Sequence, residues 1–364
     1  ISGEGEKKWL EYLQIIDQGE VPSKEMLDRW KTYGSDLPDL KPAYLKEDYP
    51  QLKNRIVYFE TSRGCPYLCS FCLSALDKTV RYFDDEIIFN QMENLINAGV
   101  KKFKFVDRTF NLKPGRMKTL MEWLSQFIGS EFHFEVVGDI LTPDILRFLE
   151  TVPPGMFQFE IGIQTTDESV QESIDRKQNN QKLFDTIKTL LVQDRIHFHC
   201  DLIFGLPGEN MGKILNSFRE VLSLRPHELQ LGFLKFLPGA PIKNTIRSHK
   251  YQYQSTPPYE LISNKDLSAE EVDYLKKFAD IFDRFYNSKR FRFSIVHLLQ
   301  KMDPVTLFDR LLHHHESNNL FMNPVALDTQ YEIFQQTFFT NPSSEEKDLL
   351  KLDYLYSQRA YRLP

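Results

Sequence analysis

The chain of 364 residues alternates between two patterns from about residue 50 to residue 245. Short runs rich in β-branched and aromatic residues are followed by longer stretches with the period of amphipathic helices. The pattern predicts six strands, at 55–61, 102–107, 132–139, 157–164, 197–204 and 228–236, with helices at 84–99, 114–128, 142–151, 167–192 and 211–224. Because each gap is long enough for a crossover helix, we expect parallel βα units rather than hairpins.

The predicted strands have two faces of different character. One face is aromatic or aliphatic, as in Phe103 and Phe105 or in Phe157 and Phe159. The other face carries Tyr58, Glu60, Lys104, His133, Glu135, Gln158, Glu160, Gln164, His197, His199, Asp201 and Gln230. Parallel strands are usually covered by apolar residues on both sides, and unpaired polar groups are costly to bury. For any one of these residues an interior network of ion pairs is as good an interpretation as a ligand contact, but the pattern as a whole favours a wet lumen that holds a polar ligand.

The alternation stops after about residue 245, and helical periodicity takes over. Amphipathic helices are predicted at 268–286, 305–314, 330–339 and 344–359, with Ser268 and Glu271 as a capping box for the first. We expect a linker at residues 1–48, a barrel at 49–245 and a helical domain at 246–364. The aromatic loop before these helices offers Tyr251, Tyr253 and Tyr259 either as substrate contacts or as ordinary interdomain packing.

Composition and charge narrow the class of protein. Apolar residues make up 41% and charged residues 26% of the chain, which are values of an ordinary globular protein. The net charge of −6 argues against a surface built to bind phosphate backbones, so we expect no nucleic acid as a partner. We find neither a run of 18 apolar residues nor a secretory signal, and we expect a cytoplasmic protein with no membrane partner.

Three of the four cysteines lie within eight residues, as Cys65-x3-Cys69-x2-Cys72. The fourth, Cys200, lies on the apolar face of a predicted strand, where a buried, inert thiol is expected. Four cysteines are too few and too bunched for a disulfide framework. Structural zinc usually takes four ligands in two separated pairs, and no second pair follows, although a zinc-stabilised binding protein stays open as a rival. Three thiolates on a cubane iron–sulfur cluster would leave one iron open to a small molecule.

At this loop the sequence resembles the radical S-adenosylmethionine (SAM) superfamily. The signature of that family is the CxxxCxxC loop with an aromatic residue before the third cysteine, here Phe71, and the resemblance covers roughly residues 50–240. It implies an α/β fold, a partial (β/α)6 TIM-like barrel, followed here by a mostly α-helical C-terminal domain. It also implies a [4Fe-4S] cluster on Cys65, Cys69 and Cys72, reductive cleavage of SAM to a 5′-deoxyadenosyl radical, and an external one-electron donor of flavodoxin or ferredoxin type.

The resemblance also implies residues that hold SAM. Phe71 would lie beside the adenine, and Asp107, Arg108 or Asn111 would replace a glycine-rich turn that many members have and this sequence lacks. Gln164 and Arg176 fall where members contact the ribose and the methionine carboxylate, although Arg176 can also be read as a solvated helix-end charge. In the family-like stretch DLIFGLPGE, Asp201 would face the lumen and Ile203 the adenine. Substrate contacts are assigned speculatively to Glu60, Glu135, His199, Tyr251 and Tyr253.

Two segments point to a subgroup of the family. Residues 3–6 and 36–40 resemble the exit from a cobalamin-binding domain and its linker, but no DxHxxG cobalamin loop occurs in these 364 residues. We therefore expect cobalamin as a cofactor only together with an upstream domain, in methyl transfer or rearrangement of an unidentified small-molecule or peptide substrate. The alternative within the family is an enzyme that uses no cobalamin, such as a relative of porphyrinogen oxidases.

Overall fold

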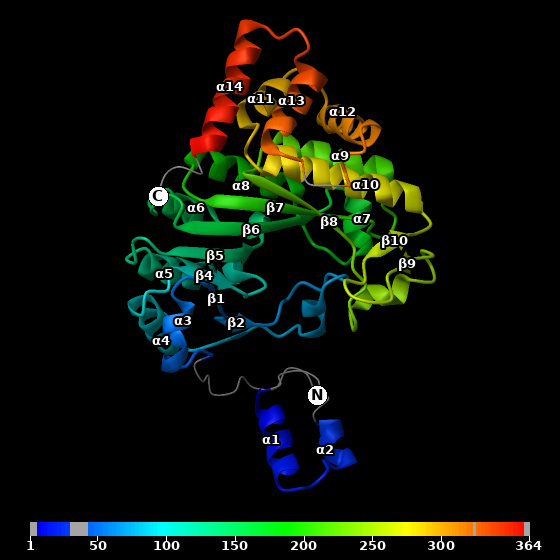
Figure 1. The fold of residues 1–364 in the computed structure, drawn as a ribbon. Helices are drawn as coiled ribbons and strands as arrows, with labels where there is room; N and C mark the ends of the chain where they lie inside the picture. The colour runs from blue at the N-terminus through cyan, green and yellow to red at the C-terminus, as the bar shows by residue number, and fades with distance from the viewer. Residues whose placement is uncertain (1–5, 30–42, 323–324, 360–364) are drawn as a thin grey trace. The chain divides into compact units, whose positions relative to one another are not determined.

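The computed structural model describes residues 6–29, 43–322 and 325–359, and Figure 1 shows its elements. The chain divides into two compact units that interleave along the sequence. The first comprises residues 1–162, 174–197 and 237–243, and the second comprises residues 163–173, 198–236 and 244–364.

A six-stranded sheet carries the first pattern found in the sequence. Its order is β1 (Ile56–Phe59), β4 (Lys102–Phe105), β5 (Glu131–Val136), β6 (Phe157–Gln164), β7 (His197–Phe204) and β8 (Glu228–Phe233). The pairs β1–β4, β4–β5, β5–β6 and β7–β8 are parallel. Helices α4 (Asp85–Asn97), α5 (Pro114–Leu124), α6 (Pro143–Leu149), α7 (Glu168–Ser173), α8 (Asn180–Gln193) and α9 (Met211–Ser223) connect the strands. The predicted α/β class with parallel βα units is confirmed.

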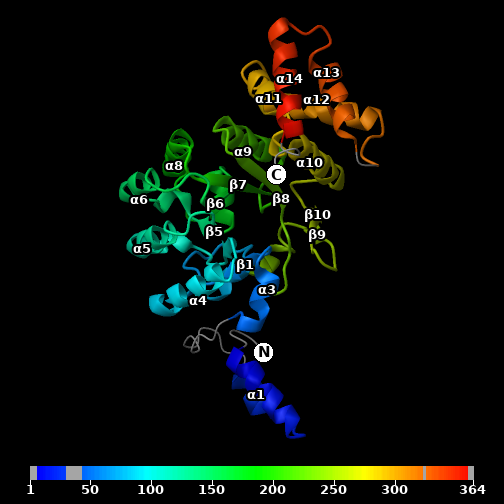
Figure 2. The ribbon, with the colours of Figure 1, turned by 60° about the vertical axis from the view of Figure 1, so that its left-hand side comes forward.

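The strands of the first unit alternate between a buried aromatic face and a half-buried polar face. In β5 and β6 every second residue is buried, and the residues between are of intermediate exposure. The rings of Phe103 and Phe132 lie 5.4 Å apart and those of Phe105 and Phe134 lie 4.5 Å apart, centroid to centroid. Helices α4, α5, α6 and α8 follow one another along one side of these strands (Figure 2). The core of this unit is therefore the phenylalanine face that the period of two predicts.

One predicted helix, at 167–192, is in fact two helices, α7 and α8. The break lies at Asp175, whose φ of +55° is left-handed and cannot continue a right-handed helix. Asn179 then starts α8 as its N-cap, because its side chain accepts a hydrogen bond from the Lys182 N–H at 2.9 Å. The interruption leaves Arg176 in the connection between the helices.

The helical part of the second unit was predicted except for one helix. It contains α10 (Ala269–Phe282), a π-helical turn (Asp283–Asn287), α11 (Arg292–Leu298), α12 (Pro304–Ser317), α13 (Leu327–Phe338) and α14 (Ser344–Arg359). The capping box of Ser268 and Glu271 is present at the start of α10. The missed helix, α11, is capped by a distant residue, since Asp353 on α14 accepts hydrogen bonds of 2.9 Å from the N–H groups of Phe293 and Ser294.

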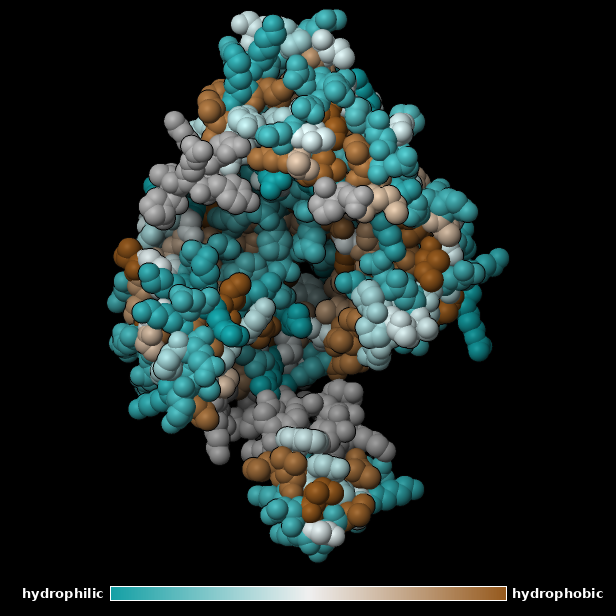
Figure 3. Space-filling view, in the orientation of Figure 1, coloured by the Kyte–Doolittle hydropathy of each residue, from teal (hydrophilic) through white to brown (hydrophobic). Residues whose placement is uncertain are grey.

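The remaining elements are short. Strands β2 (Ser62–Arg63) and β3 (Arg81–Tyr82) pair antiparallel, as do β9 (Gln252–Tyr253) and β10 (Leu261–Ser263). Helices α1 (Glu6–Asp17), α2 (Lys24–Arg29) and α3 (Tyr49–Leu52) precede the sheet. Apolar side chains gather on the surface of the part that contains α1 (Figure 3). On α1, Trp9 and Leu13 are 53% and 45% exposed.

Two features of the whole chain bear on the expectations above. Among the residues described, none of the helices has the length and apolar character that crossing a bilayer requires. The segments that resemble the exit from a cobalamin domain, at 3–6 and 36–40, lie outside the described residues except for the backbone of Glu6.

Candidate active site

The three clustered cysteines lie on the loop between β2 and β3, directly after β1. Cys65 and Cys69 are buried and Cys72 is half-buried. The loop is tied to the first unit through its backbone, because Cys65 N–H donates to Asp77 O at 3.1 Å and Ser70 N–H donates to Ile174 O at 2.9 Å. The start of the loop needs a glycine, since φ is +92° at Gly64 and a Cβ there would lie 2.2 Å from a backbone oxygen.

Asp107, at the end of β4, holds the stretch that leads into this loop. Its carboxylate is 1% exposed and accepts hydrogen bonds from Thr61 N–H at 2.9 Å, Thr61 Oγ1 at 2.6 Å and Ser62 Oγ at 2.5 Å. Burial raises the pKa of Asp107, and the same hydrogen bonds oppose that rise. Both carboxylate oxygens therefore bind the protein itself, and in this structure Asp107 positions the cysteine loop. Asn111 is occupied in a similar way, because its amide exchanges two hydrogen bonds with the backbone of Val137.

Each of the three sulfur atoms has a polar neighbour. Ser74 N–H donates to Cys72 Sγ at 3.4 Å, and Arg176 Nη1 lies 3.8 Å from Cys69 Sγ. The Thr109 hydroxyl lies 3.6 Å from Cys65 Sγ and also 2.8 Å from the Arg108 carbonyl, so its single proton can serve either acceptor. Burial raises the pKa of Cys69, and the Arg176 guanidinium opposes that rise. Donors placed in this way stabilise sulfur that carries negative charge, as thiolate ligands of a metal do.

Arg176 joins the cysteine loop to the end of β6 within the first unit. Its Nη2 donates to the carbonyl of Gly162 and its Nε donates to Gln178 Oε1 at 2.9 Å. The guanidinium is thus fixed from two sides while Nη1 faces Cys69. Arg176 follows the end of α7 by three residues, and its side chain makes these contacts, which the interpretation as a solvated helix-end charge does not predict.

The polar face of the first unit holds ion pairs. Lys104 Nζ lies 3.2 Å from Glu160 Oε2, His133 Nε2 lies 3.6 Å from the same oxygen, and Arg108 Nη1 lies 3.7 Å from Glu135 Oε1. Burial raises the pKa of Glu135, and Arg108 opposes that rise. For the first unit these contacts favour the ion-pair network over the wet lumen that the pattern as a whole favours.

Glu60, at the end of β1, is bound by a neighbouring residue. Arg63 Nε donates to both of its carboxylate oxygens, at 2.8 and 2.9 Å. Both side chains keep between a fifth and a third of their surface accessible. The two proposed substrate contacts of this unit, Glu60 and Glu135, therefore each have a basic partner already.

The second unit carries the predicted residues of late β6 and of β7. His199, Asp201 and Ile203 are half-buried on one face of β7, and the His199 and Asp201 side chains approach to 3.8 Å. Cys200 on the opposite face is fully buried, as expected, and burial raises the pKa of its thiol well above the ordinary value. Gln164 ends β6 with a left-handed φ of +69°.

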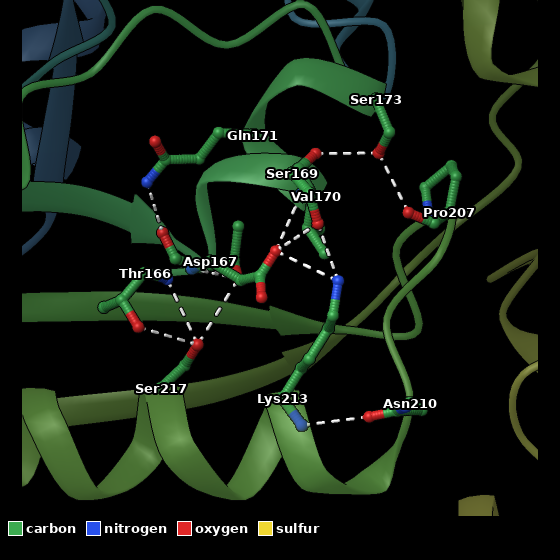
Figure 4. A network of polar contacts seen from close by, with 11 residues as sticks. Thr166, Asp167, Ser169, Val170, Gln171, Ser173, Pro207, Asn210, Lys213 and Ser217 are labelled. Atoms are coloured by element: carbon green, nitrogen blue, oxygen red, sulfur yellow. Dashed lines mark hydrogen bonds and ion pairs between the residues drawn. The ribbon is translucent and has the colours of Figure 1, made fainter.

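A polar network that sequence reasoning missed surrounds the end of β6 in the second unit (Figure 4). Ser217 on α9 accepts hydrogen bonds from Thr166 N–H at 3.1 Å and from Thr166 Oγ1 at 3.0 Å. Lys213 on the same helix pairs with Asp167 at 3.1 Å, and Ser173 donates to the Pro207 carbonyl at 2.9 Å. The run GIQTT predicts a site segment, but the partner of Thr166 on α9 is 51 residues away and that of Asp167 is 46 residues away, and neither has a sequence signal.

Glu209 is a second missed residue, and it governs the turn after β7. Its Oε2 accepts hydrogen bonds from Gly205 N–H at 3.0 Å and from Leu206 N–H at 3.3 Å. Burial raises its pKa to about 8. Tyr251 contacts the same turn, because its hydroxyl donates to the Gly205 carbonyl at 3.0 Å. The residue is 6% exposed. The ring of Tyr253 stacks on Phe236 at 4.6 Å. The motif GLPGE predicts a tight turn, but it does not predict that its last residue, Glu209, binds the backbone N–H groups of that turn.

Two family models match the chain. Residues 59–221 match the family described as the radical SAM superfamily, and residues 247–364 match a family described as a protein of unknown function (DUF4080). The first match contains the cysteine loop, Asp107, Arg176 and Asp201, and the second contains the tyrosines that follow the sheet.

Individual relatives point in the same direction. The chain is 26% identical over 233 residues to the cobalamin-dependent radical SAM methyltransferase TokK of Streptomyces tokunonensis, and 25% identical over 236 residues to the 2-(S-pantetheinyl)-carbapenam-3-carboxylate methyltransferase of Streptantibioticus cattleyicolor. Each match covers 59% of this chain and 33% of the relative, so the chain spans about a third of their length.

A solved structure supports the fold. The radical SAM methyltransferase TsrM of Kitasatospora setae, with tryptophan substrate and a SAM analogue, aligns with a TM-score of 0.55 and 13% identity over 71% of this chain and 57% of that one. At this identity the likeness shows the fold alone.

Proposed function

We propose that this protein, a radical SAM enzyme with its radical SAM domain at residues 59–221, binds a [4Fe-4S] cluster on Cys65, Cys69 and Cys72 and cleaves SAM reductively. The observation that carries the proposal is the set of polar neighbours around the three sulfurs. Three thiols on one loop fit a cubane cluster that keeps one iron for a small molecule, whereas closed structural zinc takes four protein ligands.

A cluster held by Cys65, Cys69 and Cys72 would supply one electron, taken from an external donor of flavodoxin or ferredoxin class, for cleavage of the C5′–S bond of SAM to methionine and a 5′-deoxyadenosyl radical. The chain's own residues prepare this step. Asp107 and Thr61 fix the entry to the cysteine loop. Arg176 holds a positive charge beside Cys69, and its fork geometry suits the methionine carboxylate of SAM.

The remaining SAM contacts follow from the resemblance. Phe71 is assigned to the adenine and Arg108 to the amino-acid end of SAM, and Gln164, Asp201 and Ile203 of the second unit are assigned to the ribose and adenine. The division of the chain at 48/49 and 245/246 is part of the same proposal, and the matched ranges 59–221 and 247–364 support it.

A second, finer function is cobalamin-dependent methyl transfer, favoured because two relatives are named as methyltransferases and one of them as cobalamin-dependent. Since the chain covers 33% of each, this function is proposed only for the chain acting together with a cobalamin-binding part. The substrate stays open between a small molecule and a peptide.

The test is product analysis under anaerobic conditions. Wild-type protein with a reconstituted cluster, dithionite and SAM should form 5′-deoxyadenosine, and Cys69→Ala should abolish it. Cys200→Ala, which removes a buried thiol outside the loop, is the matched control and should keep the activity. A wild-type protein with a complete cluster that forms no 5′-deoxyadenosine contradicts the proposal. For the chain together with a cobalamin-binding part and cobalamin, S-adenosylhomocysteine as a product supports methyl transfer, and 5′-deoxyadenosine without S-adenosylhomocysteine supports cobalamin-independent chemistry.

A further inference from the structure

The peptide unit between Gly205 and Leu206, just after β7, is held from both of its polar sides. On one side Glu209 accepts a hydrogen bond from the Leu206 N–H of this unit, and it also accepts one from the Gly205 N–H of the preceding unit. On the other side the Gly205 carbonyl accepts hydrogen bonds from Tyr251 Oη–H at 3.0 Å and Asn264 Nδ2 at 3.4 Å. Because φ at Gly205 is +87°, this turn uses the conformational freedom of glycine and needs outside contacts to select one orientation.

The outside contacts come from one segment, residues 249–267, which we call the clasp. Two leucines of the clasp lie beside the same glycine. A Cβ added to Gly205 would lie 2.0 Å from Leu261 Cδ2 and 3.9 Å from Leu267 Cδ1. The clasp thus touches the turn through two hydrogen-bond donors and two leucines. All of these residues belong to the second unit.

The clasp is itself a fixed structure. The side-chain oxygen of Asn264 accepts hydrogen bonds of 2.8 Å from the N–H groups of Asp266 and Leu267, which orients its Nδ2. Lys265 N–H donates to His249 O at 2.9 Å and closes the segment on itself. The ring of Tyr251 packs on Phe236 at 4.8 Å. A rigid clasp of this kind can transmit a defined position to the peptide that it holds.

The clasp also links the two matched families. Gly205 and Glu209 lie within the radical SAM match at 59–221, and Tyr251 and Asn264 lie within the match at 247–364. The turn directly continues the strand that carries Asp201 and Ile203, the residues that the proposed function assigns to SAM. A feature of the C-terminal family therefore touches the backbone next to the assigned cofactor residues.

We propose that the clasp fixes the Gly205–Leu206 peptide in the orientation that SAM binding requires, which makes Tyr251 a positioning residue for the cofactor and not a substrate contact. This inference rests on the proposed function, since it names a determinant of the same SAM site. Loss of one of the two donors at the Gly205 carbonyl should weaken SAM binding by about 3- to 10-fold, the range expected for a single neutral hydrogen bond.

The experiment compares two tyrosine-to-phenylalanine variants of the full chain with reconstituted cluster. Tyr251→Phe removes the donor to Gly205, and Tyr274→Phe removes a hydroxyl that donates to Asp309 at 3.0 Å elsewhere in the same unit. For 5′-deoxyadenosine formation, Tyr251→Phe should raise KM for SAM about 3- to 10-fold and leave kcat and iron content unchanged. Tyr274→Phe should leave all three at the wild-type values.

A second variant, Asn264→Asp, tests the same hydrogen-bond acceptor if Tyr251→Phe folds poorly. Asn264→Asp keeps the oxygen that accepts from Asp266 and Leu267 but replaces the donor that faces Gly205, so it should also raise KM for SAM. An unchanged KM in both variants overturns the proposal, as does an equal rise in Tyr274→Phe. A fall in kcat at constant KM for SAM would place the effect of Tyr251 on the cleavage step instead of on SAM binding and also overturns the proposal. If the wild-type protein forms no 5′-deoxyadenosine, the proposed function fails, and SAM affinity by anaerobic equilibrium dialysis on the same variants still tests the clasp.

Discussion

Replacement of Asp107 tests how the cysteine loop is held. Asp107→Ala removes the acceptor of three hydrogen bonds and leaves the buried Thr61 N–H and two hydroxyls without it. The N–H group should cost about 1 to 3 kcal/mol, and the hydroxyls cost less because they can rotate toward other acceptors. We expect a total loss of about 2 to 4 kcal/mol of unfolding free energy. Asp107→Asn keeps an oxygen for Thr61 N–H and removes a charge whose burial is unfavourable, so it should cost about 1 kcal/mol or less.

The assay is anaerobic urea unfolding of both variants, together with their iron content after reconstitution. The loop should lose iron in Asp107→Ala and keep most of it in Asp107→Asn. Only Asp107→Ala removes every side-chain acceptor that holds Thr61 and Ser62, the residues that lead to Cys65. If Asp107→Ala is as stable as the wild type and binds the same amount of iron, the carboxylate does not position the loop. It would then be free for the SAM contact that the family resemblance suggests.

Gly205→Ala should destabilise the protein by about 2 to 4 kcal/mol, because φ is +87° and the new Cβ would lie 2.0 Å from Leu261. Gly155→Ala, with φ of +73° and nothing within 4 Å, should cost about 1 kcal/mol, and equal costs in urea unfolding would refute the Leu261 contact. Burial raises the pKa of Glu209 from 4.5 to about 8, so the folded protein holds this proton more tightly than the unfolded chain and its contribution to stability falls as pH rises between those values. Glu209→Gln should remove that part of the pH dependence. If the free energy of unfolding, measured with urea, changes with pH between about 5 and 8 as much in the variant as in the wild type, the prediction is wrong. Arg176→Lys keeps the positive charge but loses the forked guanidinium that contacts both Gly162 O and Cys69 Sγ, so KM for SAM should rise at constant iron content. Loss of iron would instead assign Arg176 to the folding of the cysteine loop.

The sheet and the cysteine loop were accessible from the sequence because their signals are local. The period of two along β5 and β6 separates phenylalanines from polar residues. The strand β6 has the predicted bounds, whereas β5 ends three residues before the predicted end at 139. The spacing of Cys65, Cys69 and Cys72 needs no tertiary information. Ser268 and Glu271 stand three positions apart, so the capping box was equally visible.

The contacts that organise the site could not be predicted because they join distant residues. Asp107 binds Thr61 across 46 positions, and Tyr251 binds Gly205 across 46 positions as well. A lone aspartate after a strand has the same local appearance whether it binds a cofactor or a backbone N–H. The break between α7 and α8 depends on Asp175 adopting a left-handed conformation, which helical periodicity does not encode.

Iron and sulfide analysis of anaerobically purified protein, combined with electron paramagnetic resonance of the reduced sample with and without SAM, tests whether the cysteine loop holds a [4Fe-4S] cluster. We expect about four iron and four sulfide per chain, a signal that changes when SAM is added, and loss of both in Cys69→Ala but not in Cys200→Ala. One zinc ion per chain with no sulfide would contradict it, and the cysteine loop would then be a structural metal site.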